Sequence, residues 1–297
     1  MIGMDHLAIG TYEGFLIGYD IDTQPNDPKT TTGCTLRYAY AAHERSIRCI
    51  AGSFPILASA SVDESIKVYQ LDQLQELATL YDLQVPVNSV DIQLQGGLLS
   101  GGEDGKLVYY PYGGWSKPKY LKGHKGNVHS VALHPTGQIC LSVARDKCLK
   151  LWKTNGDCVC SLELPDEAFI VKWTEDGQGW VIATQTSFSV HSLQTGLIQQ
   201  WEYSTRLVCL CALTNDIFVV GGMDGHLRLY KVGENKPIQV HKVDGGSLVK
   251  GIGVGRDGCI YSLSSKGVLE ARSMQGAYRW IEQLPTSYRP TAFHVIQ

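Results

Sequence analysis

The segment CLSVARDKCLKLWKT, residues 140–154, carries the pattern on which the fold depends. A short apolar run leads into Asp146, apolar and polar residues then alternate, and Trp152 follows the aspartate by six positions. Alternation with a period of two residues on both sides of a tight turn is typical of a β-hairpin. This segment therefore predicts two antiparallel strands joined at Asp146.

The same pattern recurs in LASASVDESIKVYQL (57–71), LLSGGEDGKLVYYPY (98–112) and FVVGGMDGHLRLYKV (218–232). In each copy a tyrosine follows the turn aspartate by six positions: Asp63–Tyr69, Asp104–Tyr110 and Asp224–Tyr230. Asp-Gly, which forms two of these turns, is a hairpin-turn sequence because both residues tolerate positive φ. Four copies at one spacing indicate an internal repeat of about forty residues.

Weaker copies with turns at Glu13, near Thr186 and near Lys266 bring the number of repeats to seven. A further alternating strand precedes most hairpins, most clearly at residues 128–133, and another can follow the aromatic residue. Four short strands in about forty residues make one blade of a β-propeller. We therefore predict an all-β, seven-bladed propeller that spans residues 1–297 as a single domain, with a long polar loop at about 22–34.

Two segments carry more specific expectations. The alternating stretch 291–296 has no hairpin partner, and the first repeat lacks an inner strand; pairing of the two would close the propeller and leave no open sheet edge there. Residues 71–83 allow two interpretations. Leu71, Leu74, Leu77 and Tyr81 have near-helical spacing, but the outer strand of a blade explains the same residues within the repeat, and we favour the strand.

Composition excludes several function classes. The net charge of −3 argues against a strongly basic nucleic-acid-binding protein, and 43% apolar residues argue against disorder. No segment is apolar enough to span a membrane, and the opening MIGMDHLAIGTYEG lacks the basic start of a signal peptide. The nine cysteines are therefore interpreted as reduced thiols of a cytosolic or nuclear protein.

Two sequence patterns suggest a cofactor or metal site, and each has a simpler interpretation. Gly253–Gly258 fits G-x-G-x-x-G, but a strand follows it rather than a helix, which favours a turn. The C-x-C pairs Cys158/Cys160 and Cys209/Cys211 could together bind zinc, but small buried cysteines are more common. We expect neither a metal nor a cofactor.

The repeated turn aspartates resemble a catalytic cluster, yet their fixed distance from an aromatic residue favours a structural role. An enzyme would also need titratable groups on the inner strands, where mostly apolar residues, serine and glycine are expected. We therefore predict a non-enzymatic protein with no catalytic residues.

These repeats resemble WD40 repeats, in which a histidine, a serine or threonine two residues before the turn aspartate, the aspartate and an aromatic residue form a hydrogen-bonded tetrad. His43, Ser61, Asp63 and Tyr69 fit that pattern in the second blade. The fourth blade has Ala144 where the hydroxyl is expected, and the fifth and seventh blades lack the aspartate. The full set of residues to which the resemblance gives a tetrad role is His43, Ser61, Asp63, Tyr69, Asp104, His124, Asp146, Trp152 and Asp224.

A narrower resemblance covers most of residues 7–200. GTYEGFLIGYDI, YAAHERSIRCI and LKGHKGNVHSVALHPTGQICLSVARDKCLKLW look like the PAK-kinase-interacting, or maintenance-of-killer, WD-repeat family of nucleolar ribosome-assembly factors. The resemblance implies a scaffold in large ribosomal subunit biogenesis and rRNA processing, located in the nucleus and nucleolus, with the cytoplasm as the alternative. That family usually carries a Lys-rich C-terminal tail, and this sequence ends at Gln297, so RNA contact through such a tail is not implied.

By the same resemblance, the partners are an assembly factor or ribosomal-protein-like placeholder and a PAK-type kinase, with the pre-ribosomal particle bound indirectly by a monomer. A second hypothesis is a generic adaptor, such as a ubiquitin-ligase substrate receptor or a signalling scaffold. Loops beside the turn aspartates and after the histidines are expected to carry the interaction. The candidate protein-binding residues are Glu44, Arg45, Val62, Glu103, Lys125, Arg145 and Met223.

Overall fold

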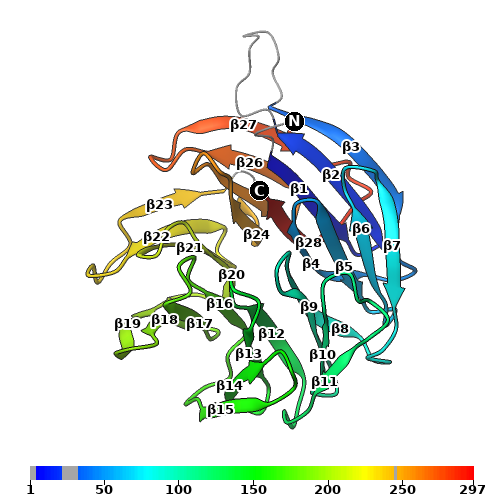
Figure 1. Ribbon diagram of the computed structural model, residues 1–297. Helices are drawn as coiled ribbons and strands as arrows, with labels where there is room; N and C mark the ends of the chain where they lie inside the picture. Colours follow the sequence, from blue (N-terminus) through cyan, green and yellow to red (C-terminus); the bar gives the residue numbers. More distant parts are fainter. Residues whose placement is uncertain (1–4, 22–32, 244–245) are drawn as a thin grey trace. The chain divides into compact units, whose positions relative to one another are not determined.

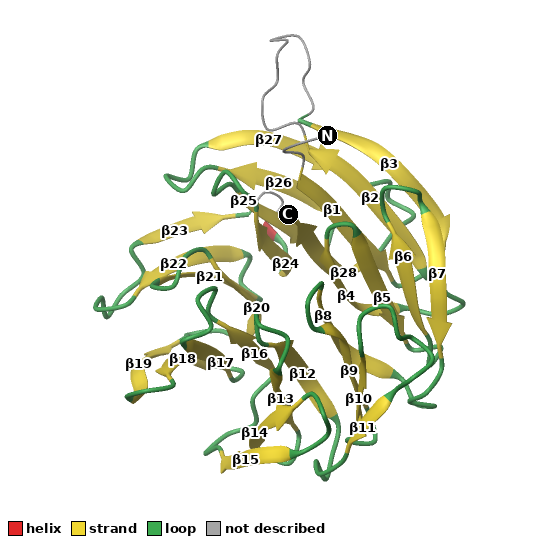
Figure 2. Ribbon diagram, in the orientation of Figure 1, coloured by secondary structure: helices red, strands yellow, loops and turns green. Residues whose placement is uncertain are grey.

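The computed structural model describes residues 5–21, 33–243 and 246–297. Within these ranges the chain forms seven four-stranded antiparallel sheets (Figure 2). The short helical segment before β24 in Figure 2 is 3₁₀ and lies at Gly246, and the described residues contain no α-helix. No helix of the described residues is long and apolar enough to cross a membrane. Seven sheets of four antiparallel strands each are the blades of a seven-bladed β-propeller, so the predicted all-β fold is confirmed.

The chain divides into two compact units. Unit 2 comprises Arg48–Ser204 and holds the second to fifth blades, which follow one another along the sequence. Their strands are β4 (Ile47–Ser53), β5 (Ile56–Ser61), β6 (Ile66–Gln70), β7 (Gln75–Leu80), β8 (Val87–Gln93), β9 (Gly97–Gly102), β10 (Leu107–Tyr110), β11 (Lys119–Leu121), β12 (Val128–Leu133), β13 (Ile139–Ala144), β14 (Cys148–Lys153), β15 (Cys158–Glu163), β16 (Ile170–Trp173), β17 (Gly179–Ala183), β18 (Ser187–Ser192) and β19 (Gly196–Glu202).

Unit 1 comprises Met1–Ile47 and Thr205–Gln297 and holds the first, sixth and seventh blades. Their strands are β1 (Asp5–Thr11), β2 (Phe15–Ile21), β3 (Cys34–Ala41), β20 (Leu207–Ala212), β21 (Ile217–Gly222), β22 (His226–Lys231), β23 (Gln239–Lys242), β24 (Val249–Val254), β25 (Ile260–Ser264), β26 (Val268–Arg272), β27 (Tyr278–Gln283) and β28 (Pro290–Ile296).

The first blade is built from both ends of the chain. Strand β28 pairs antiparallel with β1, with Leu7 opposite Val295 and Ile9 opposite Phe293 (Figure 1). Leu7 and Ile9 are fully buried, in a cluster shared with the seventh blade. The predicted pairing of residues 291–296 with the first repeat is therefore confirmed.

Two other expectations are also decided by the strands. Residues 75–80 form the outer strand β7 and not a helix. The G-x-G-x-x-G stretch lies at the end of β24 and in the turn before β25, so it is a turn and not a dinucleotide site. Of the predicted polar loop at 22–34, residues 22–32 lie outside the described residues.

Alternating apolar residues pack neighbouring blades of unit 2 against each other. Leu107 and Leu121 of the third blade and Val131 and Trp152 of the fourth share one buried cluster. Trp152 is 1% exposed, so its whole side chain is removed from water. Because such burial supplies most of the folding free energy, the blades fix their backbones firmly and leave the connecting turns to face solvent.

Candidate protein-interaction surface

Residues directly before the turn aspartate occupy the same place in several blades, and each is held through its backbone. The N–H of Glu103 donates to the carbonyl of Pro86 at 3.2 Å, and that of Arg145 donates to the carbonyl of Asn127 at 2.8 Å. Met223 is anchored in the same way. The main chain thus fixes each residue, and the side chains of all three are exposed.

The first blade has an equivalent residue that the sequence analysis missed. The N–H of Tyr12 donates to the carbonyl of Arg289 at 2.8 Å, and the Tyr12 side chain is 56% exposed. The Arg289 guanidinium lies 4.2 Å from the centre of the Tyr12 ring and pairs with Glu13 at 2.6 Å. Tyr12 could have been found by placing Glu13, which precedes Tyr19 by six positions, in register with the turn aspartates.

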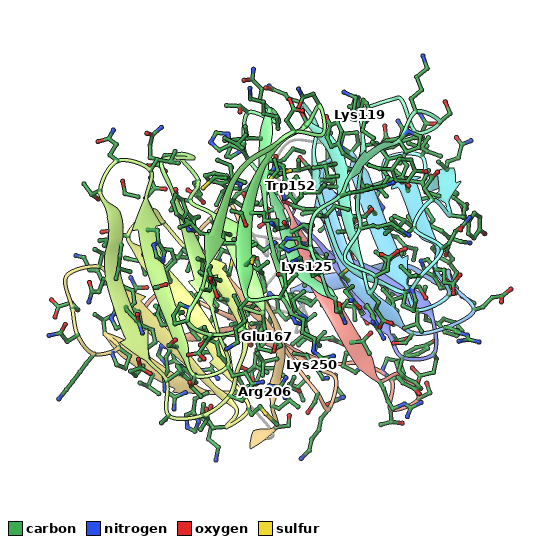
Figure 3. All side chains as sticks on the ribbon, turned by 90° about the horizontal axis from the view of Figure 1, so that it is seen from below. Lys119, Lys125, Trp152, Glu167, Arg206 and Lys250 are labelled. Carbon is green, nitrogen blue, oxygen red and sulfur yellow. The ribbon has the colours of Figure 1, made fainter. Side chains whose placement is uncertain are left out.

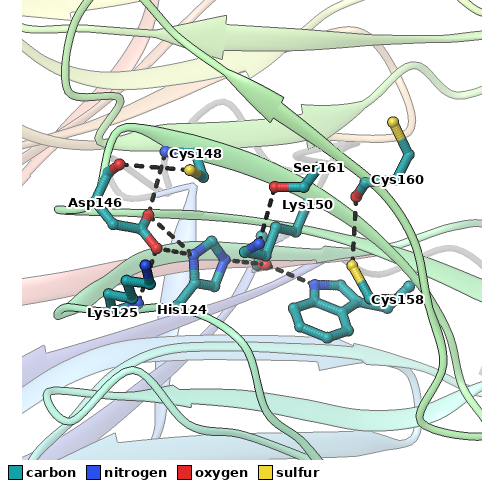
Figure 4. A network of polar contacts seen from close by, with 10 residues as sticks. His124, Lys125, Asp146, Cys148, Lys150, Cys158, Cys160 and Ser161 are labelled. Carbon is teal, nitrogen blue, oxygen red and sulfur yellow. Dashed lines mark hydrogen bonds and ion pairs between the residues drawn. The ribbon is translucent and has the colours of Figure 1, made fainter.

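A buried polar network supports the turn of the fourth blade (Figure 4). His124 Nδ1 lies 3.0 Å from both carboxylate oxygens of Asp146, and its Nε2 lies 2.7 Å from Ser142 Oγ. Trp152 Nε1 donates to the same hydroxyl at 2.8 Å. Asp146 accepts only, so Nδ1 carries the proton, and the Ser142 hydroxyl donates to Nε2 while it accepts from the indole.

In the fourth blade, the prediction that the tetrad hydroxyl belongs at position 144 is wrong. The hydroxyl is not missing at Ala144, because Ser142, four residues before the aspartate, supplies it. In the second blade the position equivalent to Ser142 is Ser59, since both pair with the central lysine of the following strand. Ser61 Oγ instead accepts the N–H of Asp63 at 3.1 Å.

The other turn aspartates are engaged by their own hairpins. Asp63 accepts the amide and hydroxyl of Ser65, Asp104 pairs with the Lys106 ammonium, and Asp224 pairs with the Arg228 guanidinium. His43 and Tyr69 are buried, at 6% and 5% exposure.

The electrostatics of His124 and Asp146 fit a structural role. Burial lowers the pKa of His124, against the raising effect of Asp146. Burial would raise the pKa of Asp146, but hydrogen bonds from the Lys125 amide and His124 outweigh it, so the pKa is lowered. A neutral imidazole between a carboxylate and a hydroxyl orients its neighbours, and its buried ring is not presented to solvent as a general base.

Three of the predicted surface residues meet in one hollow between the third and fourth blades. Glu103, Lys125 and Arg145 line a space of about 610 Å³ together with Gly126, Asn127 and Asp146. Figure 3 shows Lys125 and Trp152 among the side chains of the molecule. Glu103 forms an ion pair with Arg48 at 2.6 Å.

The remaining four predicted surface residues lie elsewhere. Glu44, Arg45 and Met223 belong to unit 1 and are exposed, with Met223 51% exposed. Val62 belongs to unit 2 and is half-buried.

Sequence reasoning also missed charged residues on the inner strands. Asp91 of β8 accepts the N–H of Leu133 at 2.7 Å, and burial raises its pKa against the lowering effect of Lys172 of β16. Apolar residues, serine and glycine are therefore not the only occupants of these strands. The Asp91 carboxylate is nevertheless occupied by a backbone amide, which gives it a role in joining neighbouring blades.

The cysteines differ sharply in environment. Cys158 and Cys160 are exposed on β15, whereas Cys209 is buried enough that the pKa of its thiol is strongly raised. Among the described residues no group of three or more His, Cys, Asp or Glu side chains could hold a metal ion.

The comparisons with known proteins agree with this geometry. Residues 34–70 and 115–153 match the family model described as WD domain, G-beta repeat. The crystal structure of the WD40 beta propeller domain of Doa1 superposes with a TM-score of 0.69 at 22% identity, over 80% of this chain and 82% of that one. Two segments of the chain thus match WD40 repeats, and the described residues have the fold of a β-propeller.

Curated relatives with more specific names are similar to this chain. A Danio rerio protein named p21-activated protein kinase-interacting protein 1-like is 29% identical over 78% of this chain and 63% of its own length. Protein MAK11 of Saccharomyces cerevisiae is 30% identical over 56% of this chain and 48% of its own length. Shk1 kinase-binding protein 15 of Schizosaccharomyces pombe is 23% identical over 78% of this chain and 67% of its own length. The chain thus spans less than two thirds of the first two of these relatives.

Proposed function

We propose that this protein is a non-enzymatic scaffold in large ribosomal subunit biogenesis. It acts in the nucleus and nucleolus, where it holds an assembly factor or ribosomal-protein-like placeholder. The observation that carries the proposal is the similarity to the PAK-interacting proteins and MAK11, together with the resemblance of residues 7–200 to their ribosome-assembly family.

The residues proposed for this role lie in loops beside the turn aspartates and after the histidines. Glu44, Arg45, Val62, Glu103, Lys125, Arg145 and Met223 are the proposed protein-binding residues, and we add Tyr12. Their support is geometric: of these residues, Glu103, Arg145, Met223 and Tyr12 are each anchored by a backbone hydrogen bond that leaves the side chain exposed to a partner.

A second proposed role is negative regulation of a PAK-type kinase by binding its regulatory region. Relatives named as kinase-interacting and kinase-binding support it. Its test is kinase autophosphorylation measured with increasing amounts of this protein; a rate that does not fall contradicts the role.

The scaffold role is tested by affinity purification of the tagged protein from its own cells, with and without RNase, followed by mass spectrometry. We expect large-subunit precursors, and one small partner that persists after RNase treatment because it binds directly. Recovery of ubiquitin-ligase or signalling components without ribosomal proteins would contradict the proposal and favour a generic adaptor. A Rattus norvegicus protein named serine-threonine kinase receptor-associated protein is 33% identical over 32% of this chain and 30% of its own length. This similarity supports a signalling scaffold as the form that such an adaptor would take.

A further inference from the structure

The hollow between the third and fourth blades contains two cations that the fold does not use. Lys125 and Arg145 line it, and both side chains are exposed. Across residues 5–21, 33–243 and 246–297, neither the Lys125 ammonium nor the Arg145 guanidinium has an ion-pair or side-chain hydrogen-bond partner. Only their backbone N–H groups are engaged, with Asp146 and Asn127.

The carboxylates of the same hollow already have donors. Glu103 receives the Arg48 guanidinium at 2.6 Å. Asp146 receives the imidazole of His124 and the amides of Lys125, at 2.9 Å, and Cys148, at 3.2 Å. The hollow therefore presents unpaired hydrogen-bond donors to a ligand: three N–H bonds on the lysine and five on the arginine.

Hydrogen bonds hold Asn127, which lines the hollow, to residues beside it. Arg48 and Asn127 are both joined to Asn88, which also donates to the carbonyl of Val128 at 3.2 Å. Gly126 contributes no side chain, and a Cβ at this position would lie 3.3 Å from Cβ of Arg145. Because glycine stands there, no side chain at position 126 crowds the base of the Arg145 side chain.

We propose that this hollow binds an acidic segment of a partner protein, with Asp or Glu carboxylates paired to Lys125 and Arg145. The proposal rests on the proposed scaffold function and specifies the chemistry of its partner. Arginine pairs with carboxylates through two parallel hydrogen bonds, so Arg145 supplies orientation and Lys125 supplies a second point of charge. Two cations beside two carboxylates suit a short peptide better than a nucleic-acid backbone, because proteins that bind nucleic acids present many cations along the backbone.

The test is selection of random peptides displayed on phage against the wild-type protein. We expect enrichment of peptides rich in Asp and Glu. A synthetic copy of the most enriched peptide is then titrated by fluorescence anisotropy against wild type and Lys125→Glu/Arg145→Glu. Loss of two charge-assisted pairs should weaken binding by about a hundredfold, at roughly tenfold each.

The matched control is Lys117→Glu/Lys153→Glu, which makes the same change in total charge at two exposed lysines of unit 2, one in the loop after β10 and one at the end of β14, both at strand ends away from the turn aspartates. It should leave the dissociation constant within about twofold, because exposed charges beyond a Debye length are screened. Lys125→Arg, which keeps both charges and leaves Arg145 in place, should retain most of the affinity, and unchanged circular dichroism shows that each variant folds.

Three outcomes would each overturn the proposal. The first is enrichment of basic or apolar peptides, and the second is equal weakening in both charge-reversed variants. The third is displacement of the peptide by a single-stranded RNA oligonucleotide but not by free glutamate-rich peptide. The purification experiment separates this from the scaffold role. If wild type and Lys125→Glu/Arg145→Glu recover the same pre-ribosomal proteins, the acidic-peptide site alone is refuted. Selected acidic peptides without pre-ribosomal recovery would refute the scaffold role alone.

Discussion

The Ser142 hydroxyl is the point at which the histidine, the tryptophan and the turn of the fourth blade are joined. It accepts from the Trp152 indole and donates to His124, which in turn donates to Asp146. Because Asp146 also caps the amide of Lys125, this chain of hydrogen bonds runs from the core to the hollow. Buried polar networks of this kind fix one geometry when every member is satisfied.

Ser142→Ala should lower the free energy of unfolding by about 3 kcal/mol, because it leaves a buried indole N–H and an imidazole nitrogen without partners. Urea denaturation at neutral pH measures the loss. Ser161→Ala, which removes an exposed hydroxyl that accepts from Lys150, should change stability by less than about 0.5 kcal/mol. Equal effects of the two substitutions would contradict a special role for Ser142.

The lowered pKa of His124 makes stability sensitive to acid. The unfolded chain takes up a proton near the ordinary value of 6.5, whereas the folded chain resists it, so stability is complete above that pH and declines as pH falls through it. Asp146 acts in the same direction at lower pH, since its lowered pKa adds stability that is lost on protonation.

We expect the free energy of unfolding of the wild type to fall between about pH 7.5 and about pH 5.5, and His124→Gln to show a smaller fall. His191 and His241, whose pKa values burial also lowers, keep part of the effect in the variant. An identical pH dependence in the two proteins would contradict this assignment.

At the scale of the element, strand β28 completes the four-stranded sheet of the first blade. Its removal would expose the edge of β1 and the buried side chains of Leu7 and Ile9. Deleting residues 290–297 should cost about 5 kcal/mol or more and lower the midpoint of thermal unfolding by at least about 10 °C. Deletion of the exposed Gln297 alone is the control, and a midpoint unchanged by the longer deletion would refute the role of β28.

The elements were largely predictable, and the details within them were not. Alternation and turn sequences located the hairpins and the pairing of β28, because a strand that buries one face must repeat every two residues. The same period explains the error at Ala144: Ser142 and Ala144 share a face of β13, and sequence does not tell which lies level with His124. Glu103 and Arg145 could be picked out from their place beside the turns and Lys125 from its place after His124, and the structure brings the three into one hollow. Their role in protein binding stays a prediction. That the two cations are left unpaired depends on Arg48, which pairs with Glu103 and is distant from it in sequence.

At the scale of the whole molecule, the two units differ in connectivity. Unit 2 is one continuous stretch, whereas unit 1 combines Met1–Ile47 with Thr205–Gln297. Bringing distant segments together costs more chain entropy, so unit 1 should form later. In refolding followed by pulsed hydrogen exchange and mass spectrometry, amides of β9 and β13 should become protected before those of β1. Earlier or simultaneous protection of β1 would contradict this order.

The backbone anchors at Glu103, Arg145, Met223 and Tyr12 also bear on how such a surface can diversify. Each anchor uses only a main-chain N–H, which every amino acid except proline provides. A mutation that replaces the side chain therefore leaves the hairpin in place, and selection can exchange charge, aromatic or apolar character there at little cost in stability. The propeller can in this way acquire a new ligand by point mutation while its architecture is inherited unchanged.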